Sequence, residues 1–130
     1  MNLEKFTHNI IKTARERSIG YCAKNVIEAL EESDGIITKI PLYPRDYEPV
    51  LLENDYIPLV GLTIDDYKPE NGDIIIWQKN NSSKAGHIQV YVKENESWYS
   101  DFKQHSIFPN FKFSHVWING GYMIYRHVIK

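Results

Sequence analysis

The chain has 130 residues, with 15 Lys and Arg against 17 Asp and Glu, and one cysteine. One domain spanning residues 1–130 is expected at this length, and 42% hydrophobic with 25% charged residues is typical of a globular protein. The formal net charge of −2 argues against binding to nucleic acid or to an anionic membrane surface. A single cysteine excludes an intramolecular disulfide and a cysteine-rich zinc site. The sequence has no His-x3-His or Cys-x2-Cys spacing, so we expect no metal site, and we also expect no cofactor.

Neither a membrane span nor an export signal is expected. The longest apolar runs are as short as residues 74–77. Glu4 lies where an export signal carries positive charge, and no apolar segment follows it. We therefore expect synthesis in the cytoplasm without a signal peptide. A target in the periplasm or cell wall then requires a specialised export route or lysis.

The first quarter of the chain has helical periodicity. Apolar residues recur at helical spacing over residues 3–16, which predicts an amphipathic helix. Gly20 interrupts the pattern, and a second stripe follows from Tyr21 to the stop signal near residues 33–35, with Ala23, Val26, Ile27 and Leu30 on one face. These residues predict a helix, a glycine break and a second helix.

The rest of the chain predicts irregular structure followed by strands. Prolines at 41, 44, 49, 58 and 69 favour irregular structure between residues 36 and 70, with short edge strands near residues 36–40. Residues 73–77 predict a strand buried on both faces, residues 87–92 and 98–102 predict a hairpin, and residues 122–128 predict a closing strand. Helices followed by an antiparallel sheet make an α+β fold.

Cys22 is the strongest candidate for a catalytic residue. It lies in the first turn of the second predicted helix, directly after the glycine break. Unpaired backbone N–H groups and the positive end of the helix favour a thiolate there, and the same groups can donate to an oxyanion. The alternative is that a lone cysteine is a small buried hydrophobic residue.

A thiol nucleophile needs a base, and His87 is the best placed of the five histidines. It follows Gly86 and opens a predicted strand, so its ring can face a cleft while the strand fixes its backbone. His105 is a weaker competitor because it lies in a less regular segment. The alternative for His87 is a hydrogen-bonded, half-buried structural histidine.

The predicted hairpin offers a third group to orient the imidazole. His87, Gln89 and Tyr91 share one face, and Ile88, Val90 and Val92 share the other, which we expect to face the core. If paired residue numbers add to an even total, Asp101 lies on the face of His87, whereas an odd total places Ser100 there. The alternative for Asp101 is a solvated carboxylate. Gln104 is a candidate for a second polar contact.

The order of Cys, His and acid along the chain is that of papain-like hydrolases, and several segments resemble one group of them. Ser18, Gly20, Tyr21 and Cys22 resemble the nucleophile helix of NlpC/P60 and CHAP-type peptidoglycan amidases. Residues 69–74 resemble the P-x-x-G-D segment of that superfamily, and residues 85–91 resemble its GH strand. Residues 98–104 and 122–126 resemble a small branch that includes phage-type lysins and secreted antibacterial effectors.

The resemblance implies a papain-like NlpC/P60-type fold, with N-terminal helices packed on a C-terminal antiparallel sheet. It implies a thiol amidase or endopeptidase that cuts peptide-stem bonds of peptidoglycan. Cys22 would attack, His87 would transfer the proton and Asp101 would orient His87. The expected substrate-binding residues are Tyr21, Ser18, Trp77, Trp98 and Gln104.

Two other functions remain open from the sequence. The same acyl-enzyme chemistry serves a papain-like protease or deamidase toxin that acts on a protein. A non-catalytic binding domain can also keep this fold. For a secreted effector we expect peptidoglycan as the substrate and a cognate immunity protein, covering the Cys22 cleft, as a partner.

Overall fold

The computed structural model describes residues 1–14 and 22–128. Its α-helices are α1 (Leu3–Thr13), α2 (Cys22–Glu32), α3 (Glu48–Glu53) and α4 (Ser114–Gly120). Its strands are β1 (Tyr56–Pro58), β2 (Ile74–Trp77), β3 (His87–Val92), β4 (Ser97–Tyr99), β5 (Lys103–Gln104) and β6 (Tyr122–His127). Short 3₁₀ helices occur at Pro44–Asp46, Ile64–Asp66, Lys93–Asn95 and Phe111–Phe113. The predicted α+β class is confirmed.

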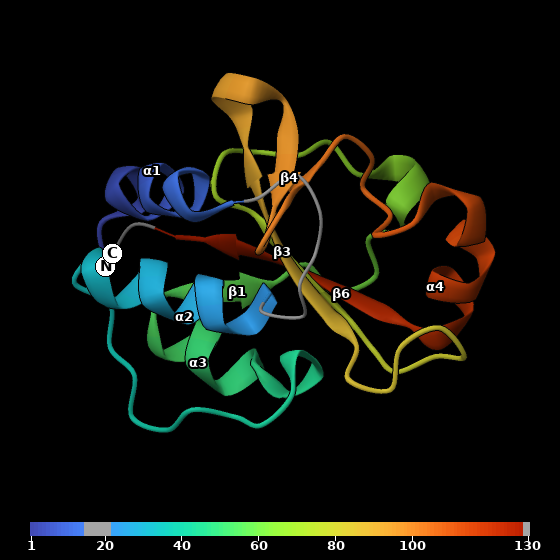
Figure 1. The fold of residues 1–130 in the computed structure, drawn as a ribbon, viewed down its shortest axis with the longest axis horizontal. Helices are drawn as coiled ribbons and strands as arrows, with labels where there is room; N and C mark the ends of the chain where they lie inside the picture. The colour runs from blue at the N-terminus through green and yellow to red at the C-terminus, as the bar shows by residue number, and fades with distance from the viewer. Residues whose placement is uncertain (15–21, 129–130) are drawn as a thin grey trace.

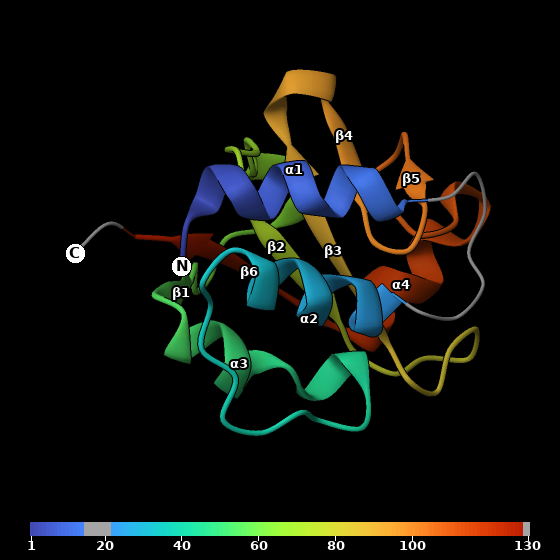
Figure 2. The same ribbon diagram turned by 60° about the vertical axis from the view of Figure 1, so that its left-hand side comes forward.

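The strands form one antiparallel sheet in the order β1-β6-β2-β3-β4-β5. α1, α2 and α3 lie together on one side, and α4 lies apart from them (Figures 1 and 2). β2 lies between β6 and β3 and is buried along its whole length, as its continuous apolar run predicts. β2 pairs with β3 from its first residue, His87, so this central strand fixes the backbone at the start of β3.

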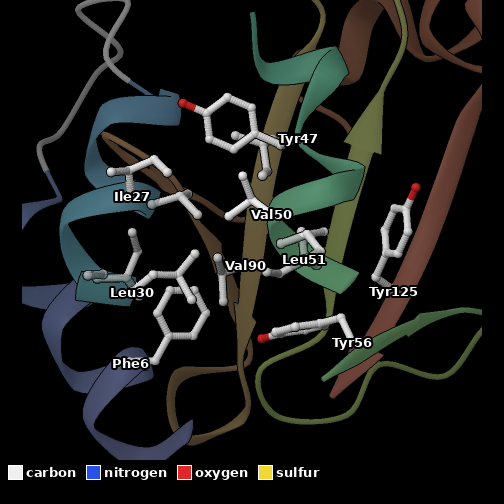
Figure 3. Packing of buried hydrophobic residues seen from close by; sticks show 14 of the residues in the cluster. Phe6, Ile27, Leu30, Tyr47, Val50, Leu51, Tyr56, Val90 and Tyr125 are labelled. Atoms are coloured by element: carbon white, nitrogen blue, oxygen red, sulfur yellow. The ribbon is translucent and has the colours of Figure 1, made fainter. Parts of the chain in front are cut away.

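Two apolar clusters cover the two faces of the sheet. The first packs α1, α2 and α3 against the sheet, with Phe6, Leu30, Leu51 and Val90 among its residues (Figure 3). Each such side chain stabilises the fold by about 1.5–3 kcal/mol when fully buried. The second cluster is rich in aromatic rings and includes Trp77, Trp98 and Trp117.

Several predicted boundaries were wrong. The first helix ends at Thr13, because Ala14 is extended and does not continue it towards residue 16. Residues 36–40 form no strand, and the edge strand of that region is β1 instead. The expectation that only one face of the hairpin is buried also fails, because the second cluster covers the face of Gln89, which is fully buried.

The numbers of the residues that pair between β3 and β4 add to an odd total. Val90 pairs with Tyr99 and Tyr91 pairs with Trp98, so the even register that would align Asp101 with His87 is not formed. β4 then ends at Tyr99, earlier than predicted, and residues 100–101 bend the chain back into β5. The position of Asp101 is therefore set by this bend rather than by strand alternation.

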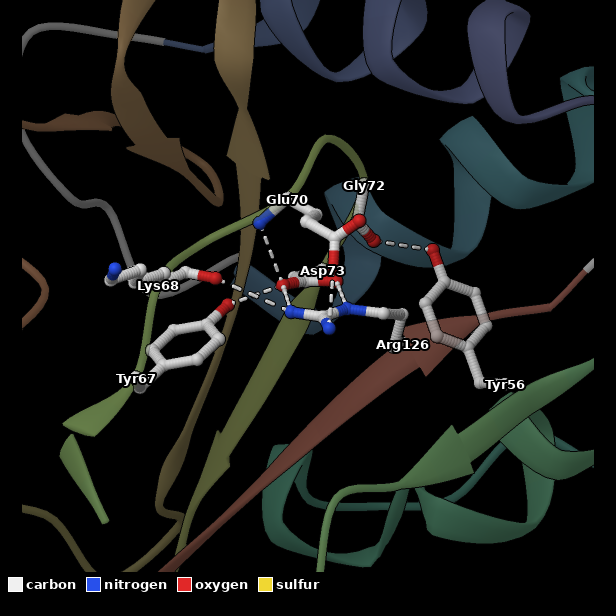
Figure 4. A network of polar contacts seen from close by, with 7 residues as sticks. All are labelled: Tyr56, Tyr67, Lys68, Glu70, Gly72, Asp73 and Arg126. Atoms are coloured by element: carbon white, nitrogen blue, oxygen red, sulfur yellow. Dashed lines mark hydrogen bonds and ion pairs between the residues drawn. The ribbon is translucent and has the colours of Figure 1, made fainter. Parts of the chain in front are cut away.

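A buried carboxylate fixes the beginning of β2. Asp73 is fully buried and accepts hydrogen bonds from the Tyr67 hydroxyl at 2.6 Å, the Glu70 amide at 2.9 Å, and Nε and Nη2 of Arg126 at 3.0 and 2.9 Å (Figure 4). Arg126 also forms an ion pair with Glu70. The network joins β6 to the turn before β2, so the P-x-x-G-D segment has a structural role here.

Candidate active site

Cys22 and His87 line the same cavity. The cavity has a volume of about 800 Å³ and lies between α2, residues 40–47 and the loop before β3. Its lining also includes Tyr43, Tyr47, Phe102, Pro109 and Trp117. Cys22 is the first residue of α2, and the residue is only 8% exposed. The predicted nucleophile and base are thus brought together although 65 residues of sequence separate them.

The surroundings of Cys22 favour the neutral thiol. Burial raises the pKa of Cys22 to about 11, and the negative charge of Asp101 acts in the same direction. Backbone hydrogen bonding from Ile88, Ala23 and Cys22 itself lowers the pKa but does not offset the burial. The predicted thiolate is therefore not the favoured form, because desolvation outweighs the effect of the helix end.

His87 is fixed by the geometry at the start of β3. It pairs with Trp77 of β2 and follows Gly86, whose φ is +74°. A Cβ at position 86 would lie 2.2 Å from the carbonyl oxygen of Trp77, so only glycine allows this close approach of the two chains. The imidazole is nearly buried and lies 6.2 Å, between ring centroids, from both Phe102 and Trp117.

Burial lowers the pKa of His87 below its usual value, although the hydrogen bond that its ring donates to Oε1 of Gln104 and the charge of Asp101 act against this. A neutral imidazole therefore accompanies a neutral thiol near pH 7. Such a pair acts by moving the thiol proton to the imidazole as the sulfur attacks, rather than through a preformed ion pair.

This electrostatic arrangement predicts slow alkylation of Cys22 at neutral pH. Because the thiolate is the reactive form, the rate with iodoacetamide should rise about tenfold per pH unit between pH 7 and 10. Mass spectrometry of the intact protein measures the rate, and Cys22 is the only thiol in the chain. Protein unfolded in guanidinium is the control, and its Cys22 thiol should titrate at about pH 8.5. A plateau of rapid labelling at pH 6 in the folded protein would contradict the neutral thiol.

Asp101 lies within electrostatic reach of both residues. It is fully buried in the bend after β4, and its charge raises the pKa values of Cys22 and His87. Asn25 of α2 donates to the Ser100 carbonyl at 3.5 Å, which ties this bend to the nucleophile helix. The described hydrogen bond of the imidazole is to another residue, since Nε2 of His87 lies 2.8 Å from Oε1 of Gln104.

Of the predicted substrate-binding residues, those that the structure describes do not line the cavity of Cys22 and His87. Trp77 and Trp98 belong to the second apolar cluster and do not line the cavity, because their rings fill the core behind β2 and β4. Gln104 is buried against His87 rather than directed to a substrate. Ser18 and Tyr21 lie outside the described residues.

Sequence reasoning missed other residues of the cavity wall. Phe102 follows Asp101, and Trp117 belongs to α4, a helix that the sequence analysis did not predict. Over residues 1–14 and 22–128, no group of three His, Cys, Asp or Glu side chains could hold a metal ion. In that same part of the chain, no helix has the length and apolar character needed to cross a membrane.

Two solved structures resemble this chain. Both are of the type VI effector–immunity complex Tae3–Tai3 from Ralstonia pickettii. The native form contains a chain that is 26% identical, covering 98% of this chain and 100% of that one, with a TM-score of 0.80. The selenomethionine form gives 27% identity, coverage of 93% and 98%, and a TM-score of 0.75.

The similarity extends over nearly the whole domain and agrees with the papain-like arrangement of a helix that begins with cysteine and a strand that begins with histidine. No family model and no curated protein matches the chain. Membership of the NlpC/P60–CHAP superfamily therefore stays a prediction.

Proposed function

We propose that this protein is an antibacterial effector that hydrolyses amide bonds in the peptide stems of peptidoglycan. The observation that carries the proposal is the shared cavity of Cys22 and His87 in a chain that is similar to one of a type VI effector–immunity complex. A papain-like hydrolase fits an amide substrate, since a thiol and an imidazole are the groups that acyl transfer requires.

In the proposed mechanism, Sγ of Cys22 attacks the carbonyl carbon while the imidazole of His87 takes the thiol proton. Backbone N–H groups at the start of α2 donate to the oxyanion that forms. The C–N bond then breaks, His87 returns the proton to the leaving amine, and a thioester remains on Cys22. Water attacks the thioester with His87 as the base, which releases the carboxylic acid and restores the thiol.

Asp101 has an electrostatic role in this proposal. Each half of the reaction produces an imidazolium from a histidine whose pKa burial lowers. The negative charge of Asp101 acts in the opposite direction and stabilises the imidazolium when it forms. Asp101 thereby offsets part of the cost of protonating His87 inside the protein.

Digestion of purified peptidoglycan sacculi tests the proposal. Wild-type protein should release stem-peptide fragments, and Cys22→Ala should lower the rate by more than about 10⁴-fold because the nucleophile is absent. Mass spectrometry of the fragments identifies the bond that is cut, and circular dichroism shows that the variant is folded. Failure of wild-type protein to release fragments from sacculi of several stem chemistries would contradict the proposal and favour a protein substrate or a non-catalytic domain.

A cognate immunity protein is the partner that we propose. Ile40 and Leu42 line the cavity and are 61% and 82% exposed, which leaves apolar surface at its edge for a protein to cover. The similarity to an effector–immunity complex supports this partner. Co-purification from the native source tests it, and recovery of the active protein alone would count against it.

We propose that the protein acts in the periplasm or cell wall of a target cell. It would be synthesised in the cytoplasm and reach this site through a specialised export route or through lysis.

A further inference from the structure

A second cavity lies between α4 and the loop that joins β2 to β3. It has a volume of about 360 Å³, and sites for small molecules typically have about 300–1,000 Å³. Most of its lining residues carry an amide or imidazole side chain. The lining consists of Asn80, Asn81, His115, Val116, Asn119 and Gly120. We call this cavity the amide pocket.

The two walls of the amide pocket are fixed relative to each other. The loop of residues 78–86 and α4 lie side by side in both views (Figures 1 and 2). A Cβ at position 120 would lie 2.9 Å from the Lys79 carbonyl oxygen, so the end of α4 packs closely on this loop. The Gln78 amide also donates to the Gly121 carbonyl at 2.9 Å. A ligand would therefore meet a preformed site, which lowers the entropy cost of binding.

Asn80 uses its side chain to shape the loop. Its Oδ1 accepts hydrogen bonds from the Ser82 and Ser83 amides at 2.8 and 3.0 Å. Its Nδ2 donates to the Gln78 carbonyl at 3.4 Å. Asn80 is therefore a structural part of the amide pocket and has little capacity left for a ligand.

The other three polar side chains of the amide pocket keep their hydrogen-bonding capacity. Asn81, His115 and Asn119 are exposed, and none of their side chains forms a hydrogen bond or ion pair within the described residues. His115 and Asn119 are four residues apart on α4, so they share one face of that helix. Each asparagine offers an NH₂ donor and a carbonyl acceptor, and the imidazole has two further nitrogens.

This lining fits an uncharged ligand with hydroxyl or amide groups. Among the lining residues that the structure describes, none is Asp, Glu, Lys or Arg. A carboxylate or phosphate ligand is typically bound by Arg or Lys, and an ammonium ligand by a carboxylate. Amide side chains both donate and accept, which matches the hydroxyl and acetamido groups of an N-acetylated sugar.

The amide pocket adjoins the catalytic cavity along both of its walls. Ser83 lines the catalytic cavity and is two residues from Asn81, so their backbones are at most about 7 Å apart. On α4, Trp117 lines the catalytic cavity and directly follows Val116 of the amide pocket. A molecule that occupies both cavities therefore needs only a short link between its two parts.

We propose that the amide pocket binds an N-acetylated sugar of the glycan strand while the attached peptide stem occupies the catalytic cavity. This inference rests on the proposed function, which supplies the stem. Each stem is joined by an amide bond to a lactyl group on a sugar, and this bond removes the charge of the lactyl carboxylate. The sugar is therefore as uncharged as the pocket requires. Asn81 and Asn119 are specificity-determining residues, because they bind the substrate away from the bond that is cut.

Binding of a neutral disaccharide tests the amide pocket without any reaction. The probe is N,N′-diacetylchitobiose, which is titrated into ¹⁵N-labelled Cys22→Ala protein. We expect the side-chain amide signals of Asn81 and Asn119, assigned from their loss in the alanine variants, to shift and saturate. No saturable shift of these signals would overturn the proposal. Saturation by N-acetyl-trialanine amide, but not by the disaccharide, would also overturn it, because the pocket would then bind peptide.

Kinetics measure what the sugar contributes to substrate binding. Soluble muropeptides from sacculi are compared with the same peptides after removal of their sugars. In the wild-type protein, KM should be about 25-fold lower for the sugar-bearing peptides, or about fivefold for each asparagine that forms a hydrogen bond. The double variant Asn81→Ala/Asn119→Ala should lose this difference, with kcat and the KM of the sugar-free peptides unchanged. Asn9→Ala on α1 is the matched control and should keep the difference, since Asn9 lines neither cavity.

The outcomes separate this proposal from the proposed function. Saturable binding of the disaccharide without any digestion of sacculi would support the sugar site and contradict the enzyme. Cys22-dependent digestion with equal KM values for the two kinds of peptide would support the enzyme and overturn the sugar site. A rise in KM for both kinds of peptide in the double variant would show that the two asparagines have only a structural role, which also overturns the proposal.

Discussion

Replacing His87 with alanine is expected to lower the rate of sacculus digestion by about 10³- to 10⁴-fold. The thiol of Cys22 is neutral because burial raises its pKa to about 11, so the reaction depends on the imidazole to remove its proton. The measurement is the initial rate of fragment release, with circular dichroism as the test of folding. The large effect follows from the neutral pair, because no preformed thiolate remains to attack without the base.

His105→Ala is the matched control for this variant. His105 is exposed and directly follows Gln104, and it does not line the cavity. We expect its loss to change the rate by less than about twofold, as for a surface substitution. The reverse pattern, with His105 essential and His87 dispensable, would identify His105 as the base and contradict the site described here.

Asp73→Ala should be the most destabilising single substitution in the polar network at the beginning of β2. The carboxylate is fully buried and accepts hydrogen bonds from Tyr67, Glu70 and Arg126. Removing one partner of a buried ion pair costs about 3–5 kcal/mol, because the other partners lose compensation for their burial. Urea unfolding followed by tryptophan fluorescence measures the change in the free energy of unfolding.

Asp65→Ala is the control, because Asp65 is an exposed aspartate near the same turn. Its effect should stay within about 0.5 kcal/mol. A loss below about 1 kcal/mol for Asp73→Ala, with an unchanged denaturant slope, would show that Arg126 satisfies its charge through Glu70 alone and that the buried carboxylate contributes little.

The elements that hold the candidate site were predictable where their periodicity was long or their burial continuous. β2 is a run of apolar residues, and β3 has the predicted bounds of residues 87–92. α3 and α4 were missed because their six and seven residues are too short for a helical stripe to stand out, and α3 also contains Pro49. Their contribution comes from packing against the sheet rather than from local propensity.

The sequence predicted the site residues that local structure marks, but not the contacts that depend on how the chain folds back. The glycine break before Cys22 and the glycine before His87 marked both residues. The contact between Gln104 and His87 follows instead from the bend at residues 100–101, which pairs Gln104 with Trp98 and so places it on the face of His87. No periodicity in a single sequence encodes such a reversal, and the register of a hairpin must be known before it can be inferred.

The burial of Cys22 has a consequence for chemical durability. Peroxides oxidise thiolates much faster than thiols, and irreversible inactivation begins with a sulfenic acid. Burial raises the pKa of Cys22 to about 11 and leaves the residue 8% exposed, and both effects are expected to slow this oxidation at neutral pH. As the only cysteine in the chain, it has no intramolecular partner for a disulfide. If Cys22 is the nucleophile of the proposed mechanism, its burial would help to keep it reduced in an oxidising environment.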